Sequence, residues 1–195
     1  LHETFYRPLL QRLQSYKEVG ATIVLEAALD ETYLRKVWEA IGNLSDRGLK
    51  DLIGEEIDLR NLLIAFSLKA RDAPSSLVDR TLIPVFYRIP KERLRSIMQV
   101  RLEDAQGILT PHYSKLVSEA INLIKSRSSK PFERPFLQQL YQAASNALKT
   151  QFFDAGYILA YLLLCECEAR NLTAITIGKQ LGLQEEEISQ SLFML

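Results

Sequence analysis

Two stretches of the chain align with each other without gaps, and this internal similarity constrains the fold more than any other feature. The segment DLIGEEIDLRNLLIAFSLKA, which begins at Asp51, matches YLLLCECEARNLTAITIGKQ, which begins at Tyr161. A repeated sequence folds into a repeated structure, so we expect two copies of one unit, residues 1–105 and 106–195. Residues upstream of the two segments also correspond in the same order: Tyr6, Leu9 and Glu26 with Tyr113, Leu116 and Glu133.

The apolar residues recur with the period of an α-helix almost everywhere. The clearest case follows Asp30, which is the expected N-cap of a helix that stops at Gly42. No stretch alternates apolar and polar residues as a half-buried strand does. The sequence therefore predicts an all-α fold of helical-bundle repeats, with about nine to eleven helices. One face of the helix after Asp30 carries Tyr33, Leu34, Val37, Trp38 and Ile41.

Charge, cysteine content and apolar run length exclude several classes of protein. The 24 Lys and Arg residues balance the 24 Asp and Glu residues, so no overall positive charge attracts nucleic acid. Cys165 and Cys167 point to different faces of a helix, which favours reduced thiols over a disulfide or a zinc site. The longest apolar run, residues 155–165, is shorter than the about 20 residues of a membrane span and predicts a buried core helix.

The chain has none of the short motifs that bind nucleotides or carry out catalysis. Neither a GxxxxGK[ST] nor a GxGxxG phosphate loop is present. The two histidines, His2 and His112, do not have a spacing typical of metal ligands. We therefore expect a protein that is not an enzyme and that binds no cofactor or metal.

Each aligned segment contains an Arg-Asn pair, Arg60-Asn61 in the first and Arg170-Asn171 in the second. The residues around the second pair resemble a known family. The segment ECEARNLTAITIGKQLGLQEEEISQSL, from Glu166, is similar to the end of the C subunit of archaeal and bacterial A/V-type ATP synthases, whose vacuolar ATPase counterpart is the d subunit. Tyr6, Glu26 and Tyr33 fit the middle repeat of that family. Family members have three helical repeats arranged as a funnel. The resemblance thus implies that this chain contains the middle and C-terminal repeats and lacks the N-terminal one.

The same resemblance implies a function. It implies a non-catalytic central-stalk adaptor, which couples the rotating central shaft subunit to the membrane proteolipid rotor ring during ATP synthesis and hydrogen ion transport. Such an adaptor is peripheral to the membrane on its cytoplasmic side, has no membrane span of its own and does not bind nucleic acid. Whether the transported ion is a proton or sodium is left open.

The two Arg-Asn segments supply the candidate structural or interface residues. In each segment an acid precedes the Arg by four positions, the favoured order for an ion pair on an exposed helix. The Asn points about 180° away from the apolar stripe of its helix, which is formed in the first copy by Leu52, Leu59, Leu63 and Phe66. Two interpretations stay open: local ion pairs and hydrogen bonds, or contacts that join the repeats or line the funnel. The candidates are Glu56, Arg60, Asn61, Glu166, Arg170 and Asn171.

Two alternatives come from other function classes. Residues 172–195 have the spacing of a helix-turn-helix, which predicts a DNA-binding regulator. The second helix of that motif, however, begins with Glu185, Glu186 and Glu187, which repel phosphate. The other alternative is a generic helical-repeat scaffold, which shares the period of the repeat but not the Arg-Asn signature in both copies.

Overall fold

The computed structural model describes residues 2–126, 132–150 and 154–193. Within these ranges the fold is all-α, as predicted, with nine α-helices, one short 3-10 helix and no strand. The helices are α1 (His2–Val19), α2 (Ile23–Ile41), α3 (Arg47–Lys69), α4 (Ser75–Thr81), α5 (Lys91–Gln99), η1 (Leu102–Ile108), α6 (Pro111–Lys125), α7 (Arg134–Thr150), α8 (Ala155–Gln180) and α9 (Glu185–Ser191).

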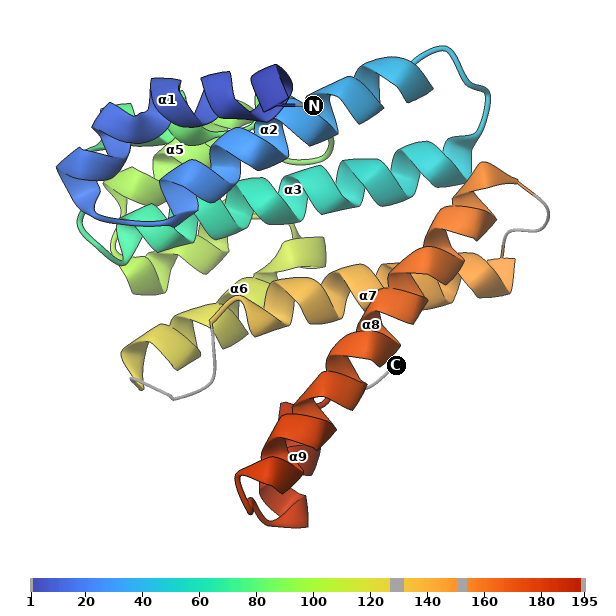
Figure 1. The fold of residues 1–195 in the computed structure, drawn as a ribbon. Helices are drawn as coiled ribbons and strands as arrows, with labels where there is room; N and C mark the ends of the chain where they lie inside the picture. Colours follow the sequence, from blue (N-terminus) through green and yellow to red (C-terminus); the bar gives the residue numbers. More distant parts are fainter. Residues whose placement is uncertain (1, 127–131, 151–153, 194–195) are drawn as a thin grey trace.

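Helix α3 is the centre of the structure. It packs against α2, α4 and α5 from its own half and against α7 and α8 from the other half. In Figure 1, α1, α2 and α3 lie alongside one another, whereas α8 crosses α7 and projects away from the body with α9 at its far end. The second half therefore covers α3 with one part of α8 and leaves another part standing clear.

The long helices α3 and α8 begin in the same way. Each has an aspartate at its N-cap, and the side chain of this residue accepts a hydrogen bond from the backbone N–H three positions on. The bond is 2.8 Å long at Asp46 and 2.7 Å long at Asp154. This bond pairs one of the N–H groups that have no partner inside the helix.

The two long helices also end in the same turn. The backbone N–H of Ala73 donates to the carbonyl of Leu68, and that of Leu183 donates to the carbonyl of Gly178, which is the bonding of a Schellman C-cap. The residue before each donor has a left-handed conformation, with φ of 51° at Asp72 and 70° at Gly182. A seven-residue helix follows in both halves, α4 and α9.

These matches support a repeated helix–turn–helix unit. The expected boundary between residues 105 and 106 lies inside η1, so the exact division into two units stays a prediction.

The apolar stripe of α3 is buried, as expected. Leu52, Leu59, Leu63 and Phe66 all belong to the hydrophobic core. The ring of Phe66 lies 6.5 Å from the ring of Phe136 on α7, measured between centroids. The two halves therefore meet through apolar side chains of α3 and α7, whose burial is the main favourable term in such a contact.

One predicted helix start is wrong. Helix α2 begins at Ile23, so Asp30 lies within the helix and is not its N-cap, whereas Gly42 is the C-cap as predicted. The helix starts earlier because Val24 and Ala27 already face the core. The carboxylate of Asp30 instead forms an ion pair with Arg60 of α3, at 3.7 Å.

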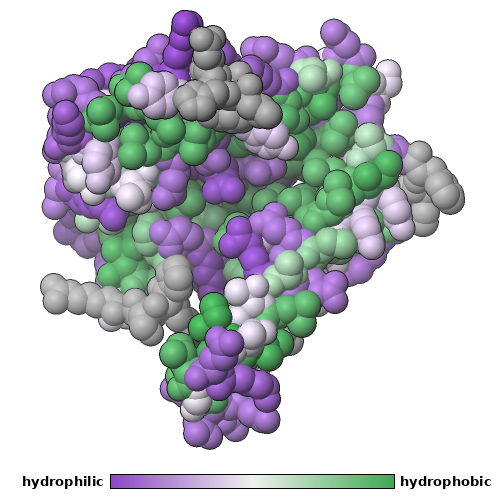
Figure 2. Space-filling model, in the orientation of Figure 1, coloured by the Kyte–Doolittle hydropathy of each residue, from purple (hydrophilic) through white to green (hydrophobic). Residues whose placement is uncertain are grey.

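The predicted burial of residues 155–165 is also wrong in part. They form the first turns of α8, where Ala160 and Leu163 are buried but Ile158, Tyr161 and Leu162 are exposed. Within the described ranges only α3, α7 and α9 pack closely against this helix, which leaves one side uncovered. Figure 2 shows apolar residues at the surface along α8. None of the described helices combines the length and the apolar character that a membrane crossing needs.

Candidate functional site

Asn61 of α3 binds the chain segment that follows α4. Its side-chain Nδ2 donates to the carbonyls of Ile83 and Val85, at 3.1 Å in both cases. Its Oδ1 accepts the backbone N–H of Ile83 at 2.8 Å. The side chain of Asn61 is fully buried, so these bonds pair polar groups that water cannot reach.

Asn171 of α8 makes the same kind of contact in the second half. Its Nδ2 donates to the carbonyl of Phe193 at 3.0 Å, and its Oδ1 accepts the N–H of Phe193 at 2.8 Å. In both halves the bonded backbone lies 22 residues after the Asn. We call each arrangement an asparagine clasp. Each clasp lies within its own half, so these hydrogen bonds do not join the halves to each other.

The acid–arginine pairs differ between the halves. Glu166 and Arg170 form the predicted ion pair, with 2.8 Å between Oε1 and Nη2. Arg60 pairs with Asp30 of α2 and not with Glu56, so the prediction for the first half is wrong. Asp30 of α2 supplies Arg60 with an acid from a neighbouring helix. The aligned residue of α7 is the uncharged Leu137, and Arg170 pairs with Glu166 of its own helix.

Glu56 lies where the two halves meet. Burial raises the pKa of its carboxyl group, the charge of Arg60 opposes this rise, and the charges of Asp30 and Glu166 add to it. Glu56, Arg60 and Arg170 line one small cavity together with Glu133 at the contact between α3 and α7. The structure therefore brings candidate residues from both Arg-Asn segments to one cavity, although Asn61 and Asn171 do not line it.

Sequence reasoning missed a buried polar network between the halves. The carboxylate of Glu55, whose side chain is 3% exposed, binds Nη1 of Arg88 at 2.6 Å and Nε2 of His112 at 2.8 Å. The hydroxyl of Tyr113 donates to Glu55 at 3.2 Å and to Asp58 at 3.1 Å. Arg88 follows α4, whereas His112 and Tyr113 lie on α6. The network thus ties α3 to Arg88 of its own half and to α6, the first helix of the second half that lies wholly beyond residue 106.

Asp58 holds backbone as well as side chains. It accepts the N–H of Tyr87 at 3.2 Å and that of Arg88 at 2.7 Å. Burial raises the pKa of Asp58, and these hydrogen bonds oppose the rise. Burial also raises the pKa of Tyr113. A sign of this network in the sequence is that Glu55 and Asp58 are three positions apart and therefore lie on one face of the helix, where a buried acid needs a partner.

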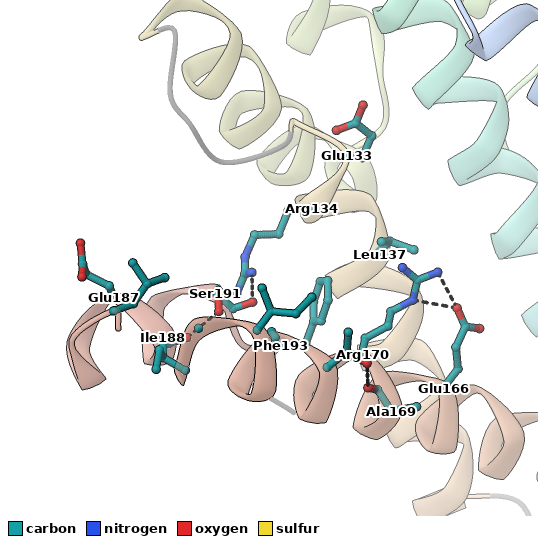
Figure 3. Close-up of a pocket in the computed structure, with 15 residues that line it drawn as sticks. Glu133, Arg134, Leu137, Glu166, Ala169, Arg170, Glu187, Ile188, Ser191 and Phe193 are labelled. Atoms are coloured by element: carbon teal, nitrogen blue, oxygen red, sulfur yellow. Dashed lines mark hydrogen bonds and ion pairs between the residues drawn. The ribbon is translucent and has the colours of Figure 1, made fainter. Parts of the chain in front are cut away.

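A groove of about 860 Å³ lies between α7, α8 and α9. Figure 3 shows Leu137 of α7 on one side, Ala169 of α8 below, and Ile188 and Phe193 on the α9 side. Arg134 closes one end, because its guanidinium donates to the carbonyls of Ser191 and Leu192 and lies 4.8 Å from the centre of the Phe193 ring. The remaining lining residues include Glu133, Glu166, Arg170, Thr173, Ala174, Ile177, Gly178, Leu183 and Glu187.

Helices α8 and α9 do form a helix–turn–helix, but its chemistry does not favour DNA. Glu185, Glu186 and Glu187 occupy the first turn of α9 and are exposed. Glu187 completes a capping box by accepting the N–H of Gln184 at 3.0 Å. These acids stabilise the start of the helix and repel a phosphate backbone. In the part of the chain that the structure covers, no group of side chains is placed to hold a metal ion.

Comparison with known proteins decides the family. Residues 1–191 match the family described as vATP-synt_AC39, ATP synthase (C/AC39) subunit. The chain belongs to the ATP synthase (C/AC39) subunit family. The resemblance inferred from the Arg-Asn segments is thereby confirmed, and the chain is related to subunits of rotary ATP synthases.

Curated relatives of this family are C subunits of A-type ATP synthases. The chain is 29% identical to the one from Methanothermobacter thermautotrophicus over 189 residues, which is 92% of this chain and 49% of the relative. It is 25% identical to the one from Methanocaldococcus jannaschii, over 98% of this chain and 49% of the relative. It is 28% identical to the one from Haloquadratum walsbyi, over 90% of this chain and 51% of the relative. The chain thus spans about half the length of these relatives. No solved structure gives a significant match.

Proposed function

We propose that the chain is part of a central-stalk adaptor, which joins the rotating shaft subunit of an A/V-type ATP synthase or ATPase to the membrane proteolipid ring. The observation that carries the proposal is the match to the C/AC39 subunit family over residues 1–191. The name of the relatives, which are C subunits of A-type ATP synthases, supports the same complex. In this proposal the chain is peripheral to the membrane, on its cytoplasmic side, and takes part in ion transport without catalysing a reaction.

The packing of the structure suits an adaptor that transmits torque. Such a part must be stiff, and close-packed interiors have low compressibility. The polar groups that hold the segment after α4 contribute to this stiffness, because Asn61 and Asp58 bind its backbone through five hydrogen bonds. A segment fixed at so many points does not slide against α3 unless several bonds break together.

The proposal assigns nucleotide chemistry to other subunits. The sequence has no phosphate loop, and the polar network around Glu55 is engaged in joining helices. A structural role is also the simplest use of Glu55 and Asp58, since each carboxylate accepts bonds from the groups packed around it.

Two titrations of the purified chain test the proposal. Isothermal titration with the shaft subunit is expected to give saturable binding, whereas titration with ATP is expected to give no heat of binding. Leu44→Lys, an exposed change in the loop between α2 and α3, is a control for nonspecific effects on the surface. Micromolar affinity for ATP, or no binding of the shaft subunit, contradicts the adaptor role.

A further inference from the structure

Asp46 binds the starts of two long helices, one in each half of the chain. Its Oδ1 accepts the N–H of Leu49 in the first turn of α3, at 2.8 Å. Its Oδ2 accepts the N–H of Gly156 in the first turn of α8, at 3.0 Å. The first N–H groups of a helix have no partner inside it, so this single carboxylate satisfies one such group in each helix.

The aspartate that caps α8 from its own half is a different residue. Asp154 accepts the N–H of Tyr157, which is the next one along the helix after Gly156. Two acids thus serve the first turn of α8, and the one that binds Gly156 comes from the other half of the chain. Gly156 is buried, so water does not simply replace this acceptor when it is lost.

The negative charge of Asp46 is favoured at this position. Burial raises the pKa of its carboxyl group, but hydrogen bonds from backbone N–H groups at both helix starts outweigh this effect and hold the pKa below its ordinary value. The positive ends of the dipoles of α3 and α8 act in the same direction. Both bonds are therefore made to a charged acceptor, which makes them roughly twice as strong as bonds between neutral groups.

The direction of α8 is decided in its first turns. Gly156, Ala160, Leu163 and Cys167 are buried in the first half of this helix, whereas Gly178 is the only buried residue of the remainder. In Figure 1 the start of α8 meets the start of α3, and the two helices then diverge. The 26 residues of α8 span about 39 Å, so a rotation of about 5° at its start moves its far end by about 3 Å.

We infer that Asp46 is a positioning residue, which fixes the direction of α8, and with it the place of α9, relative to α3. The apolar contacts of Ala160 and Leu163 with the core hold α8 in place, but such contacts are non-directional. The hydrogen bond from Gly156 is directional, so it selects one orientation of α8 among those that bury the same surface. This inference goes beyond the adaptor role, because both bonds of Asp46 lie inside the chain and involve neither the shaft nor the ring.

Asp46→Asn separates the bond to α8 from the local cap of α3. Asparagine is as good an N-cap as aspartate, so its one side-chain oxygen is expected to keep the bond to Leu49. Its NH2 group is then directed at the N–H of Gly156, and two donors do not bind each other. Asp154→Asn is the matched control, because the bond of Asp154 goes to its own helix. Far-ultraviolet circular dichroism checks that the variants fold.

Amide hydrogen exchange, followed residue by residue with NMR, measures the local effect. In Asp46→Asn the exchange rate of Gly156 is expected to rise at least about tenfold, since a bond to a charged acceptor is lost, while that of Leu49 stays within about threefold. Asp154→Asn is expected to leave both rates within about threefold. Residual dipolar couplings report the angle between α3 and α8, which is expected to change in Asp46→Asn and not in Asp154→Asn.

An unchanged exchange rate at Gly156, an equal rise at Leu49, or an unchanged angle between α3 and α8 overturns the inference. Asp46→Ser is a second variant for the case that Asp46→Asn does not fold. Serine also caps α3 through one oxygen but is too short to reach α8, so Asp46→Ser is expected to reproduce the rapid exchange of Gly156. Protection of Gly156 as in the parent contradicts this expectation, and unfolding of both variants shows that Asp46 supports the whole fold and not one angle, which overturns the inference too.

Discussion

Asn61 and Asn171 form equivalent hydrogen bonds to backbone that lies 22 residues after each of them. The equivalence gives the Arg-Asn signature a physical meaning. In both halves the amide holds the extended segment after a short helix against the long helix that carries the Asn. The Asn is thus required by the internal structure of the unit, and the Arg is free to differ in its partner.

The two clasps are expected to differ in strength. Replacing Asn61 by Ala leaves the buried N–H of Ile83 without its partner and removes a donor from the carbonyls of Ile83 and Val85, which costs about 2–3 kcal/mol of unfolding free energy. Asn171 is partly exposed and makes one fewer bond, so Asn171→Ala costs about 1–2 kcal/mol. Urea denaturation measures both values. Asn146→Ala, at an exposed position of α7, serves as control and is expected to stay within about 0.5 kcal/mol.

Arg170 allows a separate test of the ion pair. Its contact with Glu166 is half exposed, so Arg170→Ala is expected to cost no more than about 0.5 kcal/mol. A cost as large as that of Asn171→Ala would show that Arg170, and not only the Asn, supports the structure of the unit.

The turns after α3 and α8 predict a stabilising substitution. Asp72 has a φ of 51°, whereas the equivalent position in the second half is Gly182. Glycine adopts this conformation without steric cost, so Asp72→Gly is expected to raise the unfolding free energy by about 0.5–1 kcal/mol. Thermal unfolding measures the gain. The reciprocal change, Gly182→Ala, is expected to lower stability by a similar amount, and a loss of stability in Asp72→Gly contradicts the equivalence of the turns.

Gly54 is required by close packing against Tyr87. A Cβ atom at this position would overlap the Tyr87 ring, which also meets Trp38 edge to face at 5.9 Å. Gly54→Ala is therefore expected to cost about 1–3 kcal/mol. Gly107→Ala is the control, since nothing lies near its added methyl group. In a double-mutant cycle the cost of Gly54→Ala should fall when Tyr87 is also replaced by Ala; an unchanged cost excludes the ring as the cause.

The raised pKa of Glu56 predicts a pH-dependent effect. A carboxyl group whose pKa is higher in the folded chain destabilises the fold when ionised, and this loss is present at neutral pH and absent below the pKa of the unfolded chain. Glu56→Gln is therefore expected to be more stable than the parent at pH 7, with the difference shrinking as the pH falls toward about 4. Urea denaturation across this range measures it. Exposed Glu119→Gln should leave the pH curve unchanged, and a destabilising Glu56→Gln at pH 7 rejects the argument.

The sequence predicted features that depend on local pattern. The helical class, the C-cap at Gly42 and the buried stripe containing Leu59 and Leu63 all follow from periodicity and residue type. The direction of Asn61, away from this stripe, also followed from helix geometry. Its partner did not, because Ile83 lies in an extended segment whose position depends on how α4 packs.

Features that depend on the neighbours of a helix were not predictable in this way. Asp30 looked like an N-cap, but its partner is Arg60 on another helix. Residues 155–165 read as a buried helix because their apolar content is high, whereas burial depends on what covers each side of α8. The network around Glu55 joins residues far apart in the sequence, among them Arg88 and His112, so no local pattern contains it.

A bridging assay tests the adaptor role most directly. Vesicles that carry the proteolipid ring are mixed with the shaft subunit, with and without the chain, and collected by sedimentation. The account predicts that the shaft subunit sediments with the vesicles only when the chain is present, and that vesicles without the ring retain neither protein. Shaft subunit that sediments equally without the chain, or that stays in the supernatant when the chain itself has bound the ring, would contradict it.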